Sequence, residues 1–202
     1  MTIILIAISV AVSYAAFKSP KLMDQLQFNA SKIVHKNEYH RLVTHAFIHA
    51  NWEHLFVNMI VLFSFGQAIE AYFKYNFGNN AILNYALLYF GGILVSNIYA
   101  LIKHRNNYFY NSVGASGAVS AVLFAAIFFD PWNKIYFFGI LPIPGIVFAA
   151  LYLVYSYQMS TKQKDNVAHD AHFLGALFGF VFPILLNYQL FESFLDKLFR
   201  LI

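Results

Sequence analysis

Residues 167–188 read VAHDAHFLGALFGFVFPILLNY, an apolar stretch with two histidines and an aspartate near its start. Its length suits one crossing of a bilayer, which needs about 20 mainly apolar residues. His172, Gly175 and Gly179 stand at positions i, i+3 and i+7, so they share one face of a helix. Glycines on that face let a neighbouring helix approach closely, with His172 pointing into the contact. A lone buried histidine is more often a satisfied core residue than a catalyst, so the rest of the chain has to decide between these interpretations.

The whole chain shares this apolar character. Of its 202 residues, 60% are hydrophobic and 11% are charged, with a mean hydropathy of +0.58. Soluble domains are usually about 45–50% apolar and about 25% charged. Disordered, collagen-like and soluble α/β chains are excluded, and the absence of cysteine excludes a disulfide scaffold. The net charge of +4 does not predict a nucleic-acid partner, because Lys and Arg beside apolar runs are typical of membrane-flanking loops.

These observations predict an all-α, polytopic membrane protein with six transmembrane helices in one domain, residues 1–202. The apolar runs place the helices at about 2–17, 52–72, 81–102, 113–129, 140–157 and 167–188. Residues 18–51 form a loop so long that it should have a structure of its own. An amphipathic tail, Glu192–Ile202, follows the last run.

The second polar cluster is Gly114-Ala115-Ser116-Gly117, at the start of the fourth run. Ser116 falls in the first helical turn, where free backbone N–H groups and the helix dipole could stabilise an oxyanion. The alternative is ordinary packing, because Gly117 and Ala121 form a small-xxx-small seam.

The third cluster is at the start of the second run and contains His45, His49, His54 and Asn58. His54 and Asn58 are spaced i, i+4, and both can donate hydrogen bonds in neutral form. Hydrogen bonding between helices is the alternative role for this pair. Since the second, fourth and sixth helices run in the same direction, the three clusters should lie at similar depth in the membrane. A nucleophile, a base and hydrogen-bond donors at one depth are what acyl transfer requires.

Together these motifs resemble the rhomboid family of intramembrane serine proteases. Gly114-Ala115-Ser116-Gly117 resembles the serine motif, and Ala171-His172-Phe173-Leu174-Gly175-Ala176-Leu177-Phe178-Gly179 the histidine motif. His54 to Asn58, preceded by His49, resembles the H-x-x-x-N of the second helix, and Gly66 to Glu70 its G-x-x-x-E. The likeness runs from about Glu38 to Gly179.

The resemblance implies a serine endopeptidase with a catalytic dyad: Ser116 as the nucleophile and His172 as its base and later acid. It implies that His54 and Asn58 donate hydrogen bonds to the oxyanion. The remaining motif residues are expected to be structural: Gly114, Gly117, Gly175, Gly179, Arg41 and Glu70. No metal or cofactor is expected.

The partners implied by the resemblance are single-pass transmembrane substrates and the lipid bilayer. The expected location is the bacterial inner membrane, as a multi-pass protein whose active site opens outward. The charge pattern indicates the reverse orientation. Nine of the 13 Lys and Arg residues lie on the side of residues 18–51, and the positive-inside rule would place that side in the cytoplasm.

Two positions depart from the family pattern. The family often has Trp-Arg in the first loop, where this chain has His40-Arg41. It also often has an aromatic residue four positions after the serine, under the histidine ring, where this chain has Ser120. This departure implies either that other contacts position His172 or that His172 is held more loosely.

Three rival interpretations remain open. The first is a zinc or iron site made by His45, His49, His54, His169 and His172, although the chain has no H-E-x-x-H motif. The second is a rhomboid-like protein that binds membrane helices without cleaving them, although such relatives generally lack the serine or the histidine. The third is a small transporter, although no helix is clearly interrupted and no inverted repeat is visible.

Overall fold

The computed structural model describes residues 1–137, 139–162 and 167–199, and most of them are helical. The bundle is built from α1 (Thr2–Phe17), α5 (Trp52–Phe77), α6 (Ala81–Ser96), α8 (Ser116–Phe129), α9 (Gly145–Lys162) and α10 (His169–Leu186). The connections contain α2 (Pro20–Leu26), α3 (Ala30–Lys36), α4 (Arg41–Thr44), η1 (His45–Phe47), η2 (Gly78–Asn80), α7 (Ile98–Lys103), β1 (Lys134–Phe137) and β2 (Leu141–Pro144). The amphipathic α11 (Gln189–Phe199) follows α10; residues 200–202 of the predicted tail lie outside the described part.

Two predicted helix starts were too early, and the helices predicted to end at residues 72 and 157 continue to Phe77 and Lys162. The helix expected from residue 140 begins at Gly145, because residues 141–144 form β2, which pairs antiparallel with β1. Pro142 and Pro144 belong to this edge strand, where a residue without an N–H costs no ladder bond. The helix expected from residue 113 begins at Ser116, because Gly114 has a φ of 116°, outside the helical region.

The six predicted spans are not confirmed by helix length and hydropathy. Within the described residues, two helical stretches are long and apolar enough to cross a bilayer: Trp52–Lys103, with mean hydropathy 1.7, and His169–Leu186, with 1.5. α1 and α8 are apolar but have only 16 and 14 residues. A helix of 14 residues extends about 21 Å, less than the roughly 30 Å of a hydrocarbon core.

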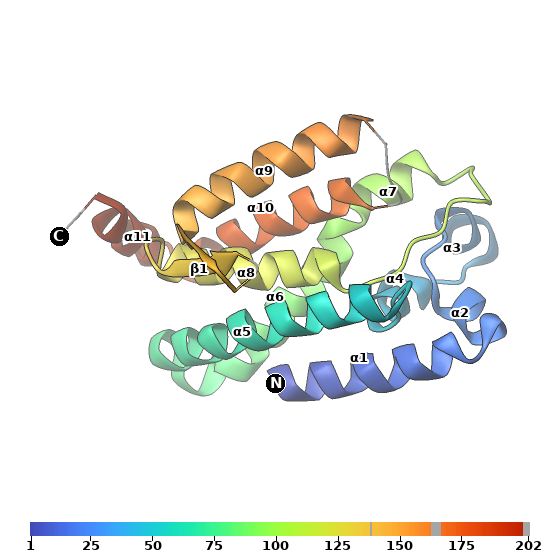
Figure 1. The fold of residues 1–202 in the computed structure, drawn as a ribbon, viewed down its shortest axis with the longest axis horizontal. Coiled ribbons are helices and arrows are strands. Elements are labelled where there is room, and N and C mark those ends of the chain that lie inside the picture. Colours follow the sequence, from blue (N-terminus) through green and yellow to red (C-terminus); the bar gives the residue numbers. More distant parts are fainter. Residues whose placement is uncertain (138, 163–166, 200–202) are drawn as a thin grey trace.

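α8 is the central helix of the bundle and contacts α5, α6, α9 and α10 (Figure 1). Every residue from Gly117 to Phe129 is buried, which explains why α8 is apolar on all sides. A Cβ atom added to Gly175 would lie 2.1 Å from the carbonyl oxygen of Gly117, and one on Gly179 would lie 2.0 Å from that of Ala121. The backbones of α8 and α10 therefore touch along the small-residue seam that the sequence predicts.

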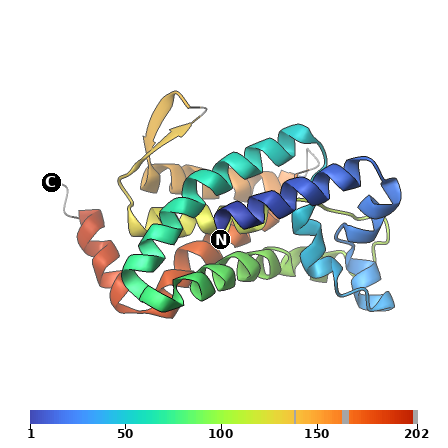
Figure 2. The same cartoon turned by 90° about the horizontal axis from the view of Figure 1, so that it is seen from below.

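α5, α8 and α10 all begin toward the end of the bundle where α2, α3 and α4 lie (Figure 1). The β-hairpin and α11 lie at the opposite end, and the hairpin projects sideways from the bundle (Figure 2). The three polar clusters are thus on one side of the molecule.

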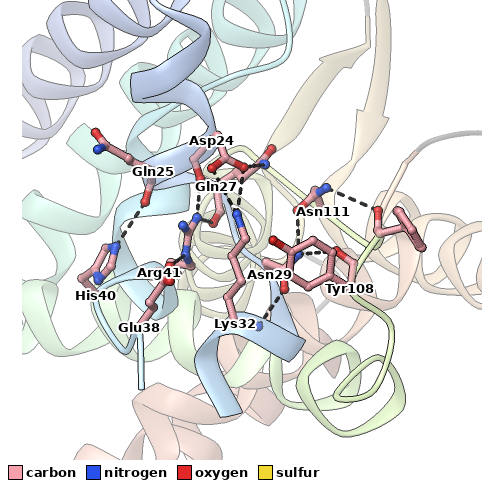
Figure 3. Close-up of polar contacts among 11 residues, drawn as sticks. Asp24, Gln25, Gln27, Asn29, Lys32, Glu38, His40, Arg41, Tyr108 and Asn111 are labelled. Carbon is pink, nitrogen blue, oxygen red and sulfur yellow. Dashed lines mark hydrogen bonds and ion pairs between the residues drawn. The ribbon is translucent and has the colours of Figure 1, made fainter. Parts of the chain in front are cut away.

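Residues 18–51 are held together around the buried guanidinium of Arg41, which is 3% exposed (Figure 3). Its Nε donates to Glu38 Oε2 at 2.5 Å, and its Nη1 donates to the backbone carbonyls of Asp24 and, at 2.8 Å, Gln27. Lys32 pairs with the Asp24 carboxylate at 2.9 Å. Arg41, the residue of the first-loop motif that this chain retains, thus fixes how α2 turns back toward α4.

Several hydrogen bonds join this loop to the segment that leads into α8. Phe28 and Ser112 exchange backbone hydrogen bonds of 2.9 and 3.1 Å. The N–H of Gly114 donates to the carbonyl of His45 at 2.9 Å. The side chain of Asn29 adds bonds to the Tyr108 carbonyl and to Asn111 (Figure 3). The path of the chain into Ser116 is therefore fixed by residues 18–51, which lie outside the bundle.

Several ionisable groups in this loop have shifted pKa values. Burial lowers the pKa of His45 to about 4 and that of His49 to about 3, so both rings are neutral at pH 7. The hydrogen bond from Lys32 lowers the pKa of Asp24, and that from Arg41 lowers the pKa of Glu38. All four groups bind protons less readily in the folded chain than in the unfolded one.

We expect Gly175→Ala to destabilise the protein, because its new methyl group would collide with the backbone of α8. Overpacking of this kind typically costs about 1–3 kcal/mol. Gly91→Ala is the matched control, since its Cβ would meet the far end of the Phe178 ring, which can move. The measurement is thermal unfolding in detergent micelles; equal unfolding temperatures for the two variants would contradict the backbone contact.

We also expect stability to fall as the pH drops. Between pH 6.5, the ordinary pKa of histidine, and about 4, the unfolded state binds protons at His45 and His49 that the folded state does not. Asp24 and Glu38 extend this loss below their ordinary carboxyl pKa values. His49→Gln removes one titrating ring, so its unfolding temperature should fall less steeply between pH 7 and 4.5. A slope equal to that of wild type would contradict the assignment.

Candidate functional site

Ser116 is the first residue of α8 and is half-buried. The cap residue, Ala115, has no side chain that could accept hydrogen bonds from the first turn. The first backbone bond of this helix runs from the N–H of Val119 to the carbonyl of Ala115. The N–H groups of the preceding turn have no intrahelical acceptor, so they can serve an anion beside Ser116.

His54 lies directly against the chain that leads into Ser116. A Cβ on Gly114 would lie 2.5 Å from Cε1 and 2.8 Å from Nε2 of His54, so only glycine leaves room for the ring. The N–H of Ala50 approaches Nδ1 of His54 at 3.5 Å. His54 thus lies beside the segment that enters α8.

Asn58 is buried one turn further along α5. Its Nδ2 donates to the carbonyl of His54 at 2.8 Å, a bond within its own helix. Asn58 thus ties its side chain to the backbone of His54, the other residue of this predicted pair. The two members of the pair differ, since His54 contacts the segment before Ser116 while the bond of Asn58 supports His54.

His172 lies in the first turn of α10, one turn before Gly175. Because Gly175 touches Gly117, and Ser116 immediately precedes Gly117, the side chains of Ser116 and His172 start from neighbouring points of one helix contact. The ring of His172 also stacks on Tyr152 of α9, with centroids 6.4 Å apart and planes at 26°. The imidazole therefore contacts α9, while its own helix, α10, packs on α8.

Two further histidines of the predicted clusters have contacts of their own. Ser13 Oγ donates its proton to the Phe47 carbonyl at 3.1 Å and lies 2.9 Å from Nδ1 of His49. Because the hydroxyl proton is used in the first bond, His49 Nδ1 donates in the second. His169 is buried and packs edge-on against His172 at 5.8 Å. No group of three or more His, Asp or Glu side chains in the described ranges is arranged to hold a metal ion, so the metal rival gains no support.

The G-x-x-x-E motif at Gly66 and Glu70 packs three helices together. A Cβ on Gly66 would lie 2.4 Å from the Tyr85 hydroxyl and 2.7 Å from Thr2. Glu70 Oε1 accepts from the backbone N–H of Thr2 at 2.7 Å. This motif acts at the start of α1, away from Ser116, which supports the expected structural role of Glu70.

Two polar residues near the site were missed by the sequence reasoning. Asn97, at the break between α6 and α7, donates to His45 Nε2 at 3.3 Å and to the Ile93 carbonyl at 2.9 Å. The hydroxyl of Tyr152 bonds Ser120 Oγ at 2.7 Å. Ser120 offered a signal, because a hydroxyl in a wholly apolar helix must find a partner.

Comparison with known proteins identifies the family. A family model described as the Rhomboid domain matches residues 36–189. RHOMBOID-like protein 12, mitochondrial, from Arabidopsis thaliana is 30% identical over 152 residues, which cover 68% of this chain and 43% of that protein. Rhomboid-like protein 11, chloroplastic, from the same plant is 34% identical over 164 residues, 74% of this chain and 53% of the relative. RHOMBOID-like protein 1 is 33% identical over 174 residues, 82% and 40% of the two chains.

The chain spans about half the length of these relatives. The printed names place two of them in the mitochondrion and the chloroplast, so they do not support the expected bacterial inner membrane. The family and the apolar helices together identify a membrane protein. With more than half of its length matched by the family model and the serine and histidine motifs in contact through α8 and α10, this chain belongs to the rhomboid family.

Proposed function

We propose that the protein is an intramembrane serine endopeptidase that cleaves transmembrane segments with a Ser116–His172 dyad. The observation that carries the proposal is the backbone contact of Gly175 with Gly117, which supports a serine and a histidine acting on the same atoms. The proposal includes six membrane crossings, with the short α8 enclosed by other helices and therefore not required to match the bilayer. Residence in a bacterial inner membrane stays a prediction.

In the proposed reaction, His172 takes the proton of Ser116 as Oγ attacks the scissile carbonyl carbon. The developing oxyanion accepts hydrogen bonds from His54, Asn58 and the first-turn N–H groups of α8. His172 then gives the proton to the leaving amine, and water hydrolyses the acyl-enzyme by the same steps in reverse. The proton returns to Ser116, so the cycle is balanced without a metal or cofactor.

The proposed substrates are single-pass membrane proteins. A helical substrate hides its carbonyls in its own hydrogen bonds, so the segment to be cut must unwind before Ser116 can attack. Small and helix-destabilising residues around the cut are therefore favoured.

We expect Ser116→Ala and His172→Ala each to reduce cleavage of a model transmembrane substrate by about 10⁴-fold or more. Ser193→Ala, on the exposed face of α11, is the matched control and should cleave like wild type. Circular dichroism should show all three variants folded. A fluorophosphonate probe should label wild type and not Ser116→Ala; a folded wild-type protein that is neither labelled nor active would instead support a helix-binding protein.

The two proposed oxyanion donors should contribute unequally to kcat. Losing one donor costs at most about 10²–10³-fold in kcat. His54→Ala should lie near that limit, since His54 contacts Gly114, and Asn58→Ala should lose less. Steady-state cleavage in micelles gives both values, and a His54→Ala protein with wild-type kcat would remove His54 from the oxyanion site.

A further inference from the structure

We propose that Tyr152 of α9 is a positioning residue for His172, and that Ser120 fixes the tyrosine ring. The inference rests on the proposed dyad and extends it to a third helix. Tyr152 supplies from α9 the aromatic contact that the family often draws from the residue four positions after the serine, where this chain has Ser120.

The geometry connects the nucleophile and the base through one side chain. Ser116 and Ser120 are spaced i, i+4, so they lie on the same face of α8. Ser120 is 4% exposed, and its Oγ lies 2.7 Å from the Tyr152 hydroxyl. The same tyrosine ring lies 6.4 Å from the His172 ring between centroids, with the two planes 26° apart. Aromatic pairs interact favourably over separations of about 4.5–7 Å.

Two further aromatic rings contact the tyrosine ring. Phe124 of α8 lies 5.4 Å from it, tilted by 54°. Phe148, one turn earlier on α9, stacks on it at 5.8 Å and 29°. With the hydroxyl bonded to Ser120, the ring has little freedom to turn or slide. A tyrosine ring held this rigidly limits the orientations that the imidazole of His172 can adopt.

A neutral positioning group suits the surroundings. A catalytic base usually needs a third group to orient it. A carboxylate in that role would have to be buried beside α8, where an unpaired charge is costly. A tyrosine ring orients by shape, and its one polar atom is satisfied by Ser120. The small side chain at Ser120 also leaves the space that the Tyr152 hydroxyl fills.

The test compares Tyr152→Leu, Tyr152→Phe and Ser120→Ala with Tyr157→Leu, a control on the same helix where the tyrosine is exposed. Misplacing a reacting group by about 1 Å can cost about 10²-fold in rate. We expect Tyr152→Leu to lower kcat about 10- to 100-fold with KM unchanged, and Tyr157→Leu to keep both. Tyr152→Phe and Ser120→Ala should lower kcat less than Tyr152→Leu. Combining them should cost no more than either alone, since both remove the same hydrogen bond.

A second readout does not depend on proteolysis. The imidazole resonances of His172, assigned by their loss in His172→Ala, should move in Tyr152→Leu because the ring current of the stacked tyrosine disappears. They should stay nearly unchanged in Tyr152→Phe and in Tyr157→Leu. A Tyr152→Leu protein with wild-type kcat and unmoved His172 resonances would overturn the inference while leaving the dyad intact. Cleavage that survives Ser116→Ala would overturn the dyad, and the resonances would still report whether Tyr152 holds the ring.

Discussion

The contact between the backbones of α8 and α10 is the constraint on which the rest of the structure depends. Gly175 lies over Gly117 and Gly179 over Ala121, at distances that leave no room for a side chain. The contact makes α8 a wholly enclosed helix, and it sets Ser116 and His172 at the same end of one seam. Packing and chemistry are therefore not alternative explanations of these glycines, because close packing is what brings the polar residues together.

A second constraint acts from outside the bundle. The segment that enters α8 is bonded to residues 18–51 through Phe28 and Ser112, and through His45 and Gly114. Those anchors are held in turn by Arg41, whose guanidinium is satisfied by Glu38 and by backbone carbonyls. The long first loop thus fixes the position of the start of α8, while the glycine seam fixes the face of α8 that contacts α10. The positive φ of Gly114 is the point where the two constraints meet, since His54 occupies the space a side chain would need.

The sequence was sufficient for features that repeat with the helical period. The shared face of His172, Gly175 and Gly179 follows from spacing alone, and so does the common direction of α5, α8 and α10. The sequence was insufficient where the composition of a segment suits two kinds of secondary structure. The apolar residues 140–144 fit a helix or a strand, and the hairpin forms because Pro142 and Pro144 oppose a helix. α8 reads as a membrane span, yet its 14 residues are apolar because protein surrounds them.

Contacts between helices that are distant in sequence could not be predicted. Ser120 signals that a partner exists, but only the packing of α9 on α8 shows that the partner is Tyr152. The same holds for Asn97 and His45, which are brought together by the loop and by the break between α6 and α7. Periodicity describes one helix at a time and contains no information about which faces meet.

The distribution of charge gives the site its chemical character. The ion pairs of Arg41 and Lys32 lie in the loop outside the bundle, and Glu70 lies toward the other end of α5. Around the start of α8, the polar side chains are hydroxyl, amide and imidazole groups, which can be buried at moderate cost when they are bonded. The ring of Tyr152 offers the imidazole of His172 an orienting contact that requires no further buried charge. Precision at His172 then depends on how rigidly α8, α9 and α10 pack, so the glycine seam that builds the fold also limits the motion of the proposed base.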